Sequence, residues 1–589
     1  MWGNLFMGLL TRMVDIYLMK LSKIRQKFFQ GKESRNRKSG EITMTLRRFK
    51  KLSVALTLAF AINGIFTPAW APASVQAAKK TDGLHTAASV WENETDTLLK
   101  TPSGLIRGRQ HENISIFRGI PYAKPPVGKL RFAPTEPVEP WKGILDATKF
   151  SPMITQNGVK NTDEGALTLN IWTPAKTGEK LPVYVFIHGG AFASGSGSQD
   201  TYESTNLAKQ GIVAVTINYR LNAFGFLAHE TALKEYGTTG NWGLLDQIEA
   251  LKWLKANIAA FGGDPERITI GGESAGSFSV SALIASPLAK GLFQQAIMES
   301  GCILNIPSVS PITRGDLKMS VGDSRRYVEL MGGSDTPEGI AYMRGIAADD
   351  LAANTRFRVY ATTDPQPFCF WPVFDGKVLP LNPMEAVKKG DLNPVRLMVG
   401  FNTDEGTLFI EQPATEADYH AALYNSFGAK APEFFKKYPV DAAHDAFDRI
   451  SQVFGASTIK SGGMAYADAL TKKGQDVFFY RYDFRNPNLP EASRLGVMHA
   501  GELKYIFGNL GDGLSKYPSA RKMSDKMLTM WANFIKTGDP NGAEGIDGQR
   551  WEKYDPANRR DFRLGEQCGM EPLYEEQLLS EINEALWTK

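Results

Sequence analysis

The stretch Arg267-Ile268-Thr269-Ile270-Gly271-Gly272-Glu273-Ser274-Ala275-Gly276 decides the fold of this chain. Its apolar start predicts a strand, and residues 277–285 predict the helix that follows. A strand that feeds directly into a helix must turn so sharply that the residues around the serine need minimal side chains, and Gly272 and Gly276 supply them. The turn presents the hydroxyl of Ser274 above the edge of the sheet. By itself the motif is a weak signal, because the chain has 56 glycines and ordinary turns use the same residues.

Other segments predict alternating strands and helices. Continuous apolar runs are typical of strands buried on both faces. Such runs occur at residues 182–187, 211–219, 395–399 and 477–482. Apolar residues recur at helical spacing between Gly243 and Ala260, and Gly262-Gly263 ends that pattern. Strands that alternate with helices predict an α/β fold, with a mainly parallel central sheet and helices on both faces.

Two long segments interrupt this pattern, residues 303–392 and 408–474. Both are helix-prone and irregular, and both are too long to be plain connections. We expect large cap or side insertions that wall a pocket over the sheet; the alternative is that they only thicken the fold. Since the candidate chemistry extends from Gly190 to His499, residues 101–589 are expected to form a single catalytic domain.

The composition is that of a soluble globular protein, with 43% hydrophobic and 22% charged residues. The net charge of +4 comes from the N-terminal part, because residues 1–80 hold 15 Lys and Arg against 3 Asp and Glu. The remainder carries about −8 and lacks the basic stripe that nucleic-acid binding requires. Cys302, Cys369 and Cys568 are odd in number and far apart, so the sequence favours no disulfide framework and leaves one bridge open.

Residues 44–77 have the order of a signal peptide: a basic start, an apolar stretch at residues 52–66 and small residues ending at Ala77. The apolar stretch is short for a membrane span. We therefore expect cleavage near Ala77 and a secreted or periplasmic protein; an uncut anchor helix is the alternative. Residues 1–43 are a basic extension that we interpret as untranslated, and N-terminal sequencing that finds them would contradict this. Residues 78–100 are a polar lead-in.

A serine hydroxyl is a weak nucleophile at neutral pH, so Ser274 requires a base and an acid that orients the base. His499 follows the last predicted strand by a loop, and reactive groups of open α/β sheets collect beyond the carboxyl ends of the strands. The other histidines lie before the sheet, beside glycines or in polar and helical contexts: His85, His111, His188, His229, His420 and His444. Its position therefore favours His499 as the base, although a histidine chosen without such evidence is more often structural.

The orienting acid should be a carboxylate at another strand end, before the histidine in the chain. Asp404 and Glu405 both qualify, and on an extended backbone they point in different directions. The pattern alone does not choose between them. The order Ser274, then Asp404 or Glu405, then His499 is that of the α/β-hydrolase fold and differs from the orders of chymotrypsin and subtilisin.

Acyl transfer also requires backbone N–H groups directed at the oxygen that becomes negative. The amide of Ala275, directly after the nucleophile, is one candidate. The others lie in His188-Gly189-Gly190-Ala191-Phe192, where small residues let main-chain N–H groups approach a substrate. A Gly-Gly pair after a strand can also be an ordinary turn, but its place upstream of Ser274 favours an oxyanion hole.

Residues 261–276 read Phe-Gly-Gly-Asp-Pro-Glu-Arg-Ile-Thr-Ile-Gly-Gly-Glu-Ser-Ala-Gly. With this serine signature, the sequence from about Gly104 to near the C-terminus resembles the type-B carboxylesterase family, which includes cholinesterases and bacterial para-nitrobenzyl esterases. Further segments that resemble the family are residues 117–123, 218–221, 240–247 and 538–542.

The resemblance implies a role for each candidate. The acid of the family is the glutamate of Asp-Glu-Gly, which corresponds to Glu405, and the histidine of its Gly-x-x-His segment corresponds to His499. The implied oxyanion-hole donors are Gly190, Ala191 and Ala275, and Ala191 stands where cholinesterases carry glycine.

The chain departs from the family at Glu164-Gly165-Ala166-Leu167, where the second family signature reads Glu-Asp-Cys-Leu. The cysteine that closes a small loop in animal members is absent. That loop is therefore expected to be unbridged, and the sequence leaves open any pocket wall built from it. The triad of Ser274, Glu405 and His499 is untouched.

The sequence thus predicts a serine carboxylesterase that hydrolyses small-molecule carboxylic esters through an acyl-enzyme, without a metal or organic cofactor. A lipase acting on long-chain lipid esters is the alternative among enzymes. A non-catalytic binding protein on the same scaffold is the alternative outside them, but such relatives lose a triad residue and this chain retains all three. Aromatic residues are more often core than pocket. The candidates for an apolar substrate pocket are Phe192, Phe278, Phe370 and Trp371.

Overall fold

A computed structural model describes residues 95–587 apart from 177, 306–315, 354, 356–369 and 491–492. All of the described residues belong to one compact unit, which spans Ala77–Lys589. The predicted signal peptide, the extension before it, His85 and Cys369 lie outside the described residues. Cys302 and Cys568 are buried free thiols.

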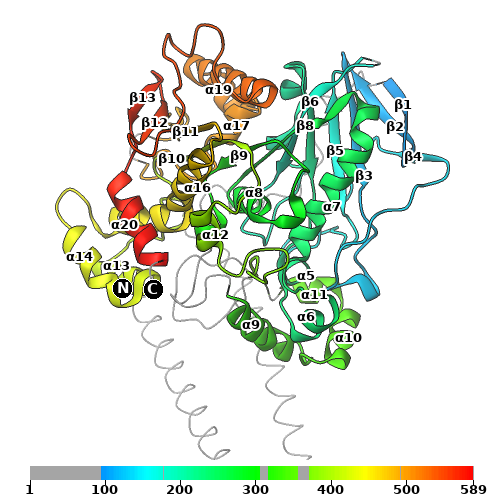
Figure 1. Ribbon diagram of the computed structural model, residues 1–589, viewed down its shortest axis with the longest axis horizontal. Coiled ribbons are helices and arrows are strands. Elements are labelled where there is room, and N and C mark those ends of the chain that lie inside the picture. Colours follow the sequence, from blue (N-terminus) through cyan, green and yellow to red (C-terminus); the bar gives the residue numbers. More distant parts are fainter. Residues whose placement is uncertain are drawn as a thin grey trace, which may run out of the picture. The chain divides into compact units, whose positions relative to one another are not determined.

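A single thirteen-stranded sheet forms the centre of this unit (Figure 1). Its spatial order is β1 (Thr95–Thr101), β2 (Gly104–His111), β3 (Ile114–Pro121), β5 (Thr168–Thr173), β7 (Val213–Ile217), β6 (Leu181–Ile187), β8 (Gly263–Glu273), β9 (Gln295–Glu299), β10 (Arg396–Asn402), β11 (Val477–Tyr482), β12 (Arg560–Leu564) and β13 (Gly569–Pro572). A short strand, β4 (Ile144–Asp146), pairs with β2. The pairs from β7 through β12 are parallel, whereas those from β1 to β7 and the pair β12–β13 are antiparallel.

The predicted apolar strands are confirmed as β6, β7, β8, β10 and β11. The sequence missed the antiparallel edge and the parallel strands β9 and β12. It also placed His111 before the sheet, which is wrong, because this residue ends β2. The edge strands β1 and β2 have exposed and buried positions mixed along them. Antiparallel strands with one solvated face lack the continuous apolar run by which buried parallel strands are recognised.

The alternation of side chains along the strands divides the core into two layers. In β6, Val183, Val185 and Ile187 join the larger apolar cluster, together with residues of α7 (Trp242–Asn257), α8 (Ala275–Ala285) and α16 (Ser461–Lys472). Tyr184 and Phe186 join the second cluster, with residues of α4 (Thr205–Lys209), α17 (Leu503–Ile506) and α19 (Pro518–Thr537). Helices therefore cover both faces of a mainly parallel sheet, as predicted.

The two long segments are mostly helical where the structure describes them. The first contains α9 (Leu317–Leu330), α10 (Pro337–Gly345), α11 (Ala348–Ala353) and α12 (Pro383–Lys389). The second contains α13 (Glu416–Phe427), α14 (Ala431–Lys437), α15 (Ala446–Phe454), a π-helical segment (Gly455–Lys460) and α16. Their role as a cap stays a prediction. The remaining helices are α5 (Asn222–Phe226), α6 (Glu230–Tyr236), α18 (Gly511–Ser515) and α20 (Glu576–Trp587).

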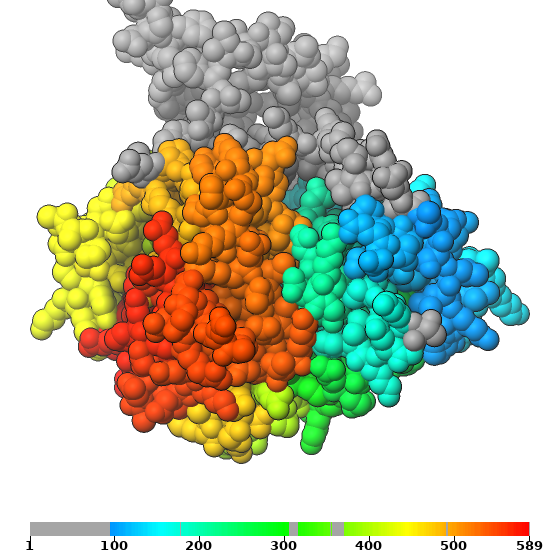
Figure 2. Space-filling model, turned by 90° about the horizontal axis from the view of Figure 1, so that it is seen from above, coloured from blue at the N-terminus to red at the C-terminus, as the bar shows by residue number. Residues whose placement is uncertain are grey.

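The C-terminal helix α20 packs against α16 and the π-helical segment. On the face seen in Figure 2, the orange and red C-terminal residues lie between the yellow α13–α14 region and the blue N-terminal strands. Among the described residues, no helix has both the length and the apolar character that crossing a bilayer requires.

Candidate active site

The predicted nucleophile elbow joins β8 to α8. Ser274 has φ 56° and ψ −124°, a strained conformation for a residue other than glycine. A Cβ atom added to Gly276 would lie 1.9 Å from Ile187 O, and one added to Gly272 would lie 2.6 Å from Gly276 C. Both positions therefore require glycine because the backbones approach closely. The amide of Ser274 donates to Glu299 O at 3.0 Å, which fixes the elbow to β9.

The structure brings His499 and Glu405 together. Nδ1 of His499 lies 2.5 Å from Oε2 of Glu405, and both side chains are buried. The other carboxylate oxygen of Glu405 accepts a hydrogen bond from the amide of Asn402 at 2.7 Å. Nε2 of His499 forms no hydrogen bond with any described residue, Ser274 included, and lies 3.1 Å from Oε1 of Glu273.

Asp404, the other candidate acid, holds the histidine loop instead. Its amide donates to Val497 O at 3.0 Å, and its carboxylate accepts a hydrogen bond from the amide of Val497 at 2.7 Å. Gly496 faces this carboxylate so closely that a Cβ would lie 2.1 Å from it, and the glycine has φ 57°. The two neighbouring acids thus point to different partners, although Glu405 lies in a turn and not on an extended backbone.

The candidate oxyanion segment follows β6 in an unusual backbone conformation. Gly190, Ala191 and Phe192 have φ of 105°, 57° and 57°. The carbonyl of Gly190 accepts hydrogen bonds from two amides further along the loop, and the carbonyl of Phe192 accepts one from Asn222 at 2.7 Å. Ala275 is the first residue of α8, so its N–H has no acceptor within the helix.

Comparison with known proteins decides the family. A model of the Carboxylesterase family matches residues 95–580. The chain belongs to the carboxylesterase family. It is 33% identical to the para-nitrobenzyl esterase of Bacillus subtilis (strain 168) over 498 residues, which cover 81% of this chain and 96% of that protein. It is 30% identical to the acetylcholinesterase of Bungarus fasciatus over 517 residues, which cover 80% of this chain and 83% of that protein.

The solved structures agree with the sequence comparison. A structure titled PNB esterase superposes with a TM-score of 0.72 at 33% identity, covering 84% of this chain and 100% of that chain. The predicted α/β-hydrolase fold is confirmed, and the protein is a carboxylic ester hydrolase.

The carboxylesterase buries three further glutamates near His499, which the sequence analysis missed. Glu273 and Glu299 are register partners on the neighbouring strands β8 and β9, and Glu502 follows His499 by three residues. Glu299 Oε1 accepts a hydrogen bond from the indole N–H of Trp531 at 2.7 Å. The only sequence signals were the glutamate inside the serine motif and the glutamate shortly after the histidine.

Burial controls the charge of these groups. Burial raises the pKa of Glu299 to about 8 and that of Glu502 to about 7, and it raises the pKa of Glu273 well above its usual range. Burial lowers the pKa of His499, whereas the carboxylates of Glu273 and Glu405 raise it when they are ionised.

A Glu299→Gln variant tests the charge state of this buried carboxyl group. The folded protein holds a proton on Glu299 up to about pH 8, whereas the unfolded chain releases it near pH 4.5. This group therefore contributes stability that is present at low pH and lost as pH rises between these values. We expect the free energy of unfolding of the variant, relative to wild type, to increase between pH 5 and pH 8, by on the order of 2 kcal/mol.

Thermal melts of both proteins across this range measure the effect. Glu338→Gln, at an exposed position, is the control and should leave the pH dependence of Tm as in wild type. Parallel pH profiles of Tm for Glu299→Gln and wild type would contradict a protonated Glu299.

Three of the four candidate pocket aromatics form one cluster. The ring centroids of Phe192 and Trp371 lie 5.4 Å apart, those of Phe278 and Trp371 5.8 Å, and those of Phe192 and Phe278 6.5 Å. Phe370 packs elsewhere, against Tyr327 of α9 at 5.0 Å. The cluster adjoins both the oxyanion segment and the nucleophile helix.

An ion pair secures the segment in which the family cysteine is missing. The guanidinium of Arg131 donates to both carboxylate oxygens of Glu164, and both side chains are buried. A third nitrogen of Arg131 donates to Ile346 O at 2.6 Å, which ties this segment to the end of α10. The unbridged loop is therefore held by charge-assisted hydrogen bonds.

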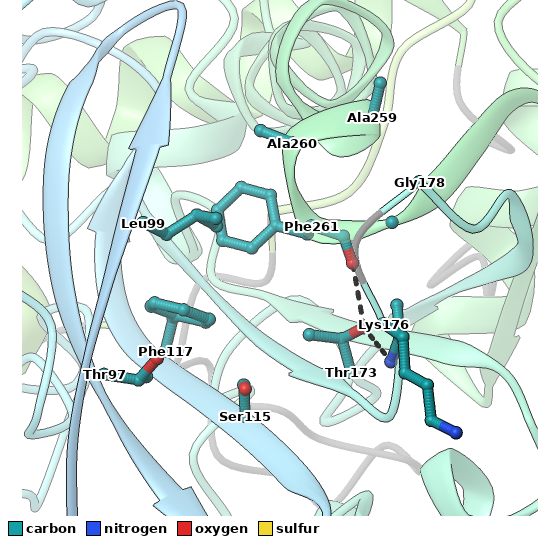
Figure 3. A pocket seen from close by; sticks show the side chains of 12 residues that line it. Thr97, Leu99, Ser115, Phe117, Thr173, Lys176, Gly178, Ala259, Ala260 and Phe261 are labelled. Atoms are coloured by element: carbon teal, nitrogen blue, oxygen red, sulfur yellow. Dashed lines mark hydrogen bonds between the residues drawn. The ribbon is translucent and has the colours of Figure 1, made fainter.

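A cavity of about 310 Å³ lies away from these groups, between β1, β3 and the residues around Phe261 (Figure 3). Two hydroxyl groups of its lining are already paired, since Thr173 donates to Phe261 O at 2.8 Å and Ser115 donates to the side chain of Gln110 at 2.7 Å. No predicted site residue lines this cavity. In the described part of the chain, no group of three or more His, Cys, Asp or Glu side chains is placed to hold a metal ion.

Proposed function

We propose that this carboxylesterase hydrolyses small carboxylic esters through an acyl-enzyme formed on Ser274, with His499 as the base and Glu405 as the orienting acid. The observation that carries the proposal is the buried 2.5 Å contact between Nδ1 of His499 and Glu405. It leaves Nε2 as the nitrogen available to a serine hydroxyl. The strained elbow holds Ser274 half-buried at the start of α8.

In the first half of the reaction, Nε2 of His499 accepts the proton of Ser274 while Oγ forms a bond to the ester carbonyl carbon. The carboxylate of Glu405 stabilises the imidazolium. The bond to the alkoxy oxygen then breaks, and the alcohol leaves with the proton from Nε2. In the second half, a water molecule gives its proton to Nε2 and attacks the acyl carbon, and the released Ser274 oxygen recovers that proton.

The amides of Gly190, Ala191 and Ala275 are proposed to donate to the oxyanion of each tetrahedral intermediate. The positive φ values at residues 190 and 191 turn the main chain of this segment away from a regular strand. The N-terminus of α8 adds a partial positive charge at Ala275.

Glu273 is the group that could compete with Ser274 for the imidazole. An ionised Glu273 would form an ion pair with Nε2 at 3.1 Å and hold His499 protonated. Burial opposes this by raising the pKa of Glu273. We infer that Glu273 is uncharged when His499 acts as the base.

We place the acyl group of the substrate against Phe192, Phe278 and Trp371. Their rings pack against one another beside the oxyanion segment, and we expect them to limit the length of the acyl chain. We expect kcat/KM for nitrophenyl esters to be highest for short acyl chains and to fall about tenfold or more for long ones. Trp371→Ala should raise kcat/KM for the longer chains relative to the short ones.

The same esters distinguish an esterase from a lipase when the rates are measured with and without emulsion. A carboxylesterase prefers dissolved short-chain esters. Rates that rise sharply on emulsified long-chain esters would contradict the proposal and favour a lipase acting on lipid esters.

We also propose that the enzyme is exported and that residues 44–77 are its cleaved signal peptide. The proposal rests on the order of basic, apolar and small residues in the sequence, since this segment lies outside the described residues.

A further inference from the structure

A buried lysine outside the proposed triad lies beside residues 403–405, the acid loop, which carries the proposed acid Glu405. Lys460 ends the π-helical segment, and its side chain is 2% exposed. Nζ donates hydrogen bonds to Thr403 O at 2.9 Å and to Oε2 of Glu575 at 2.8 Å. The rings of Phe401 and Tyr574 flank the ammonium, with centroids 5.2 and 5.0 Å from Nζ.

A buried ammonium group is costly unless it is paired and hydrogen-bonded. Lys460 meets this requirement with one carboxylate, one carbonyl and two aromatic faces. The carboxylate of Glu575 is held in turn, because it also accepts a hydrogen bond from the side chain of Gln452 at 2.9 Å. The ion pair therefore connects the acid loop to the segment that precedes α20.

Thr403 stands two residues before Glu405, and its main chain is fixed on both sides. Its amide donates to Tyr482 O of β11 at 3.1 Å, and its carbonyl accepts from Lys460. The first residue of the π-helical segment, Gly455, contacts the same loop, since a Cβ atom there would lie 3.2 Å from Cβ of Glu405. Both ends of the π-helical segment thus touch the turn that carries the acid.

We propose that the Lys460–Glu575 ion pair is a positioning device for Glu405. By holding the Thr403 carbonyl, it sets the turn at the place from which the carboxylate reaches Nδ1 of His499. This inference rests on the proposed function of Glu405 as the acid of the triad. A displacement of about 1 Å can cost about a hundredfold in rate, so a fixed turn matters for a contact of 2.5 Å.

The decisive variant is Lys460→Met combined with Glu575→Met. It removes one charge of each sign and keeps apolar volume, a replacement that buried ion pairs often tolerate. We expect it to fold, with kcat lowered about tenfold or more and KM changed less than about twofold. The acid limb of the pH profile of kcat/KM should move to lower pH, because a displaced Glu405 stabilises the imidazolium less.

Asp404 is the other carboxylate near the ammonium, and Lys460 lowers its pKa against the larger opposing effect of burial. The double variant loses one charge of each sign and keeps Glu273 and Glu502, the other carboxylates that raise the pKa of His499, so a shifted acid limb reports the position of Glu405. Lys526→Met combined with Asp547→Met is the matched control, because it removes in the same way an ion pair between α19 and residue 547, outside the loop that carries Glu405. We expect its kcat to stay within about twofold of wild type.

The reference measurement is Glu405→Gln in the same assay. If this variant is impaired while the folded double variant keeps the kcat and acid limb of wild type, the positioning role is overturned and the triad stands. If Glu405→Gln keeps the kcat of wild type, Glu405 is not the acid of the triad, and the proposed function is contradicted independently of the positioning role. The positioning role is supported if kcat is lowered and the acid limb is shifted in the double variant but not in the control.

Discussion

Replacing Ser274 with alanine is expected to lower kcat about a million-fold, because the reaction then lacks the atom that attacks the ester. The substitution removes one oxygen from a side chain that no hydrogen bond ties to His499, so folding should be unaffected. Binding of the ester depends on the pocket and on backbone donors, so KM should change far less than kcat. Steady-state kinetics on a short-chain nitrophenyl ester measure both.

Ser277→Ala is the matched control for this variant. Ser277 lies three residues further along the same chain, is buried, and donates its hydroxyl to Gly301 O at 2.7 Å. Its loss should reduce stability by about 1 kcal/mol and leave kcat near that of wild type. A Ser274→Ala enzyme that retains a substantial fraction of wild-type kcat would mean that another nucleophile acts.

Replacing Glu405 with glutamine is expected to lower kcat about ten-thousand-fold. The amide keeps the shape of the side chain but cannot stabilise an imidazolium, and it can present a donor to Nδ1 where a carboxylate accepts. His499 would then favour the tautomer that leaves Nε2 protonated and unable to accept the proton of Ser274. The same kinetic assay measures the loss.

Asp404→Asn is the matched control at the neighbouring acid. Its amide oxygen can still accept the hydrogen bond from Val497, which the carboxylate accepts at 2.7 Å in the wild type. We expect kcat within about fivefold of wild type. A greater loss from Asp404→Asn than from Glu405→Gln would reverse the proposed roles of these two acids.

Sequence patterns predicted the features that depend on local chemistry. The elbow glycines follow from backbone crowding, and the continuous apolar runs identified β6, β7, β10 and β11 because those strands are buried. The order of serine, acid and histidine predicted the fold. The pattern did not show whether Asp404 or Glu405 is the acid, because adjacent residues at one strand end differ only in the direction of their side chains. The family resemblance favoured Glu405. The structure gives each acid its own partner.

Features that depend on distant segments escaped the sequence. Lys460 and Glu575 are 115 residues apart, and neither lies in a recognisable motif. The pairing of Glu299 with Trp531 joins residues 232 apart. A buried charge has no local signature, because its partners come from other strands and helices. The edge strands β1 and β2 were missed for a different reason, since exposed and buried positions are mixed along them.

Trapping the acyl-enzyme tests the central proposal most directly. The full-length enzyme is incubated with an organophosphate ester, and the adduct is located by mass spectrometry of its peptides. We predict one adduct per inactivated enzyme, on Ser274, and no adduct at this site in Ser274→Ala. An inactivated enzyme that carries its adduct on another residue, or an unmodified Ser274 in fully inhibited protein, would contradict the account.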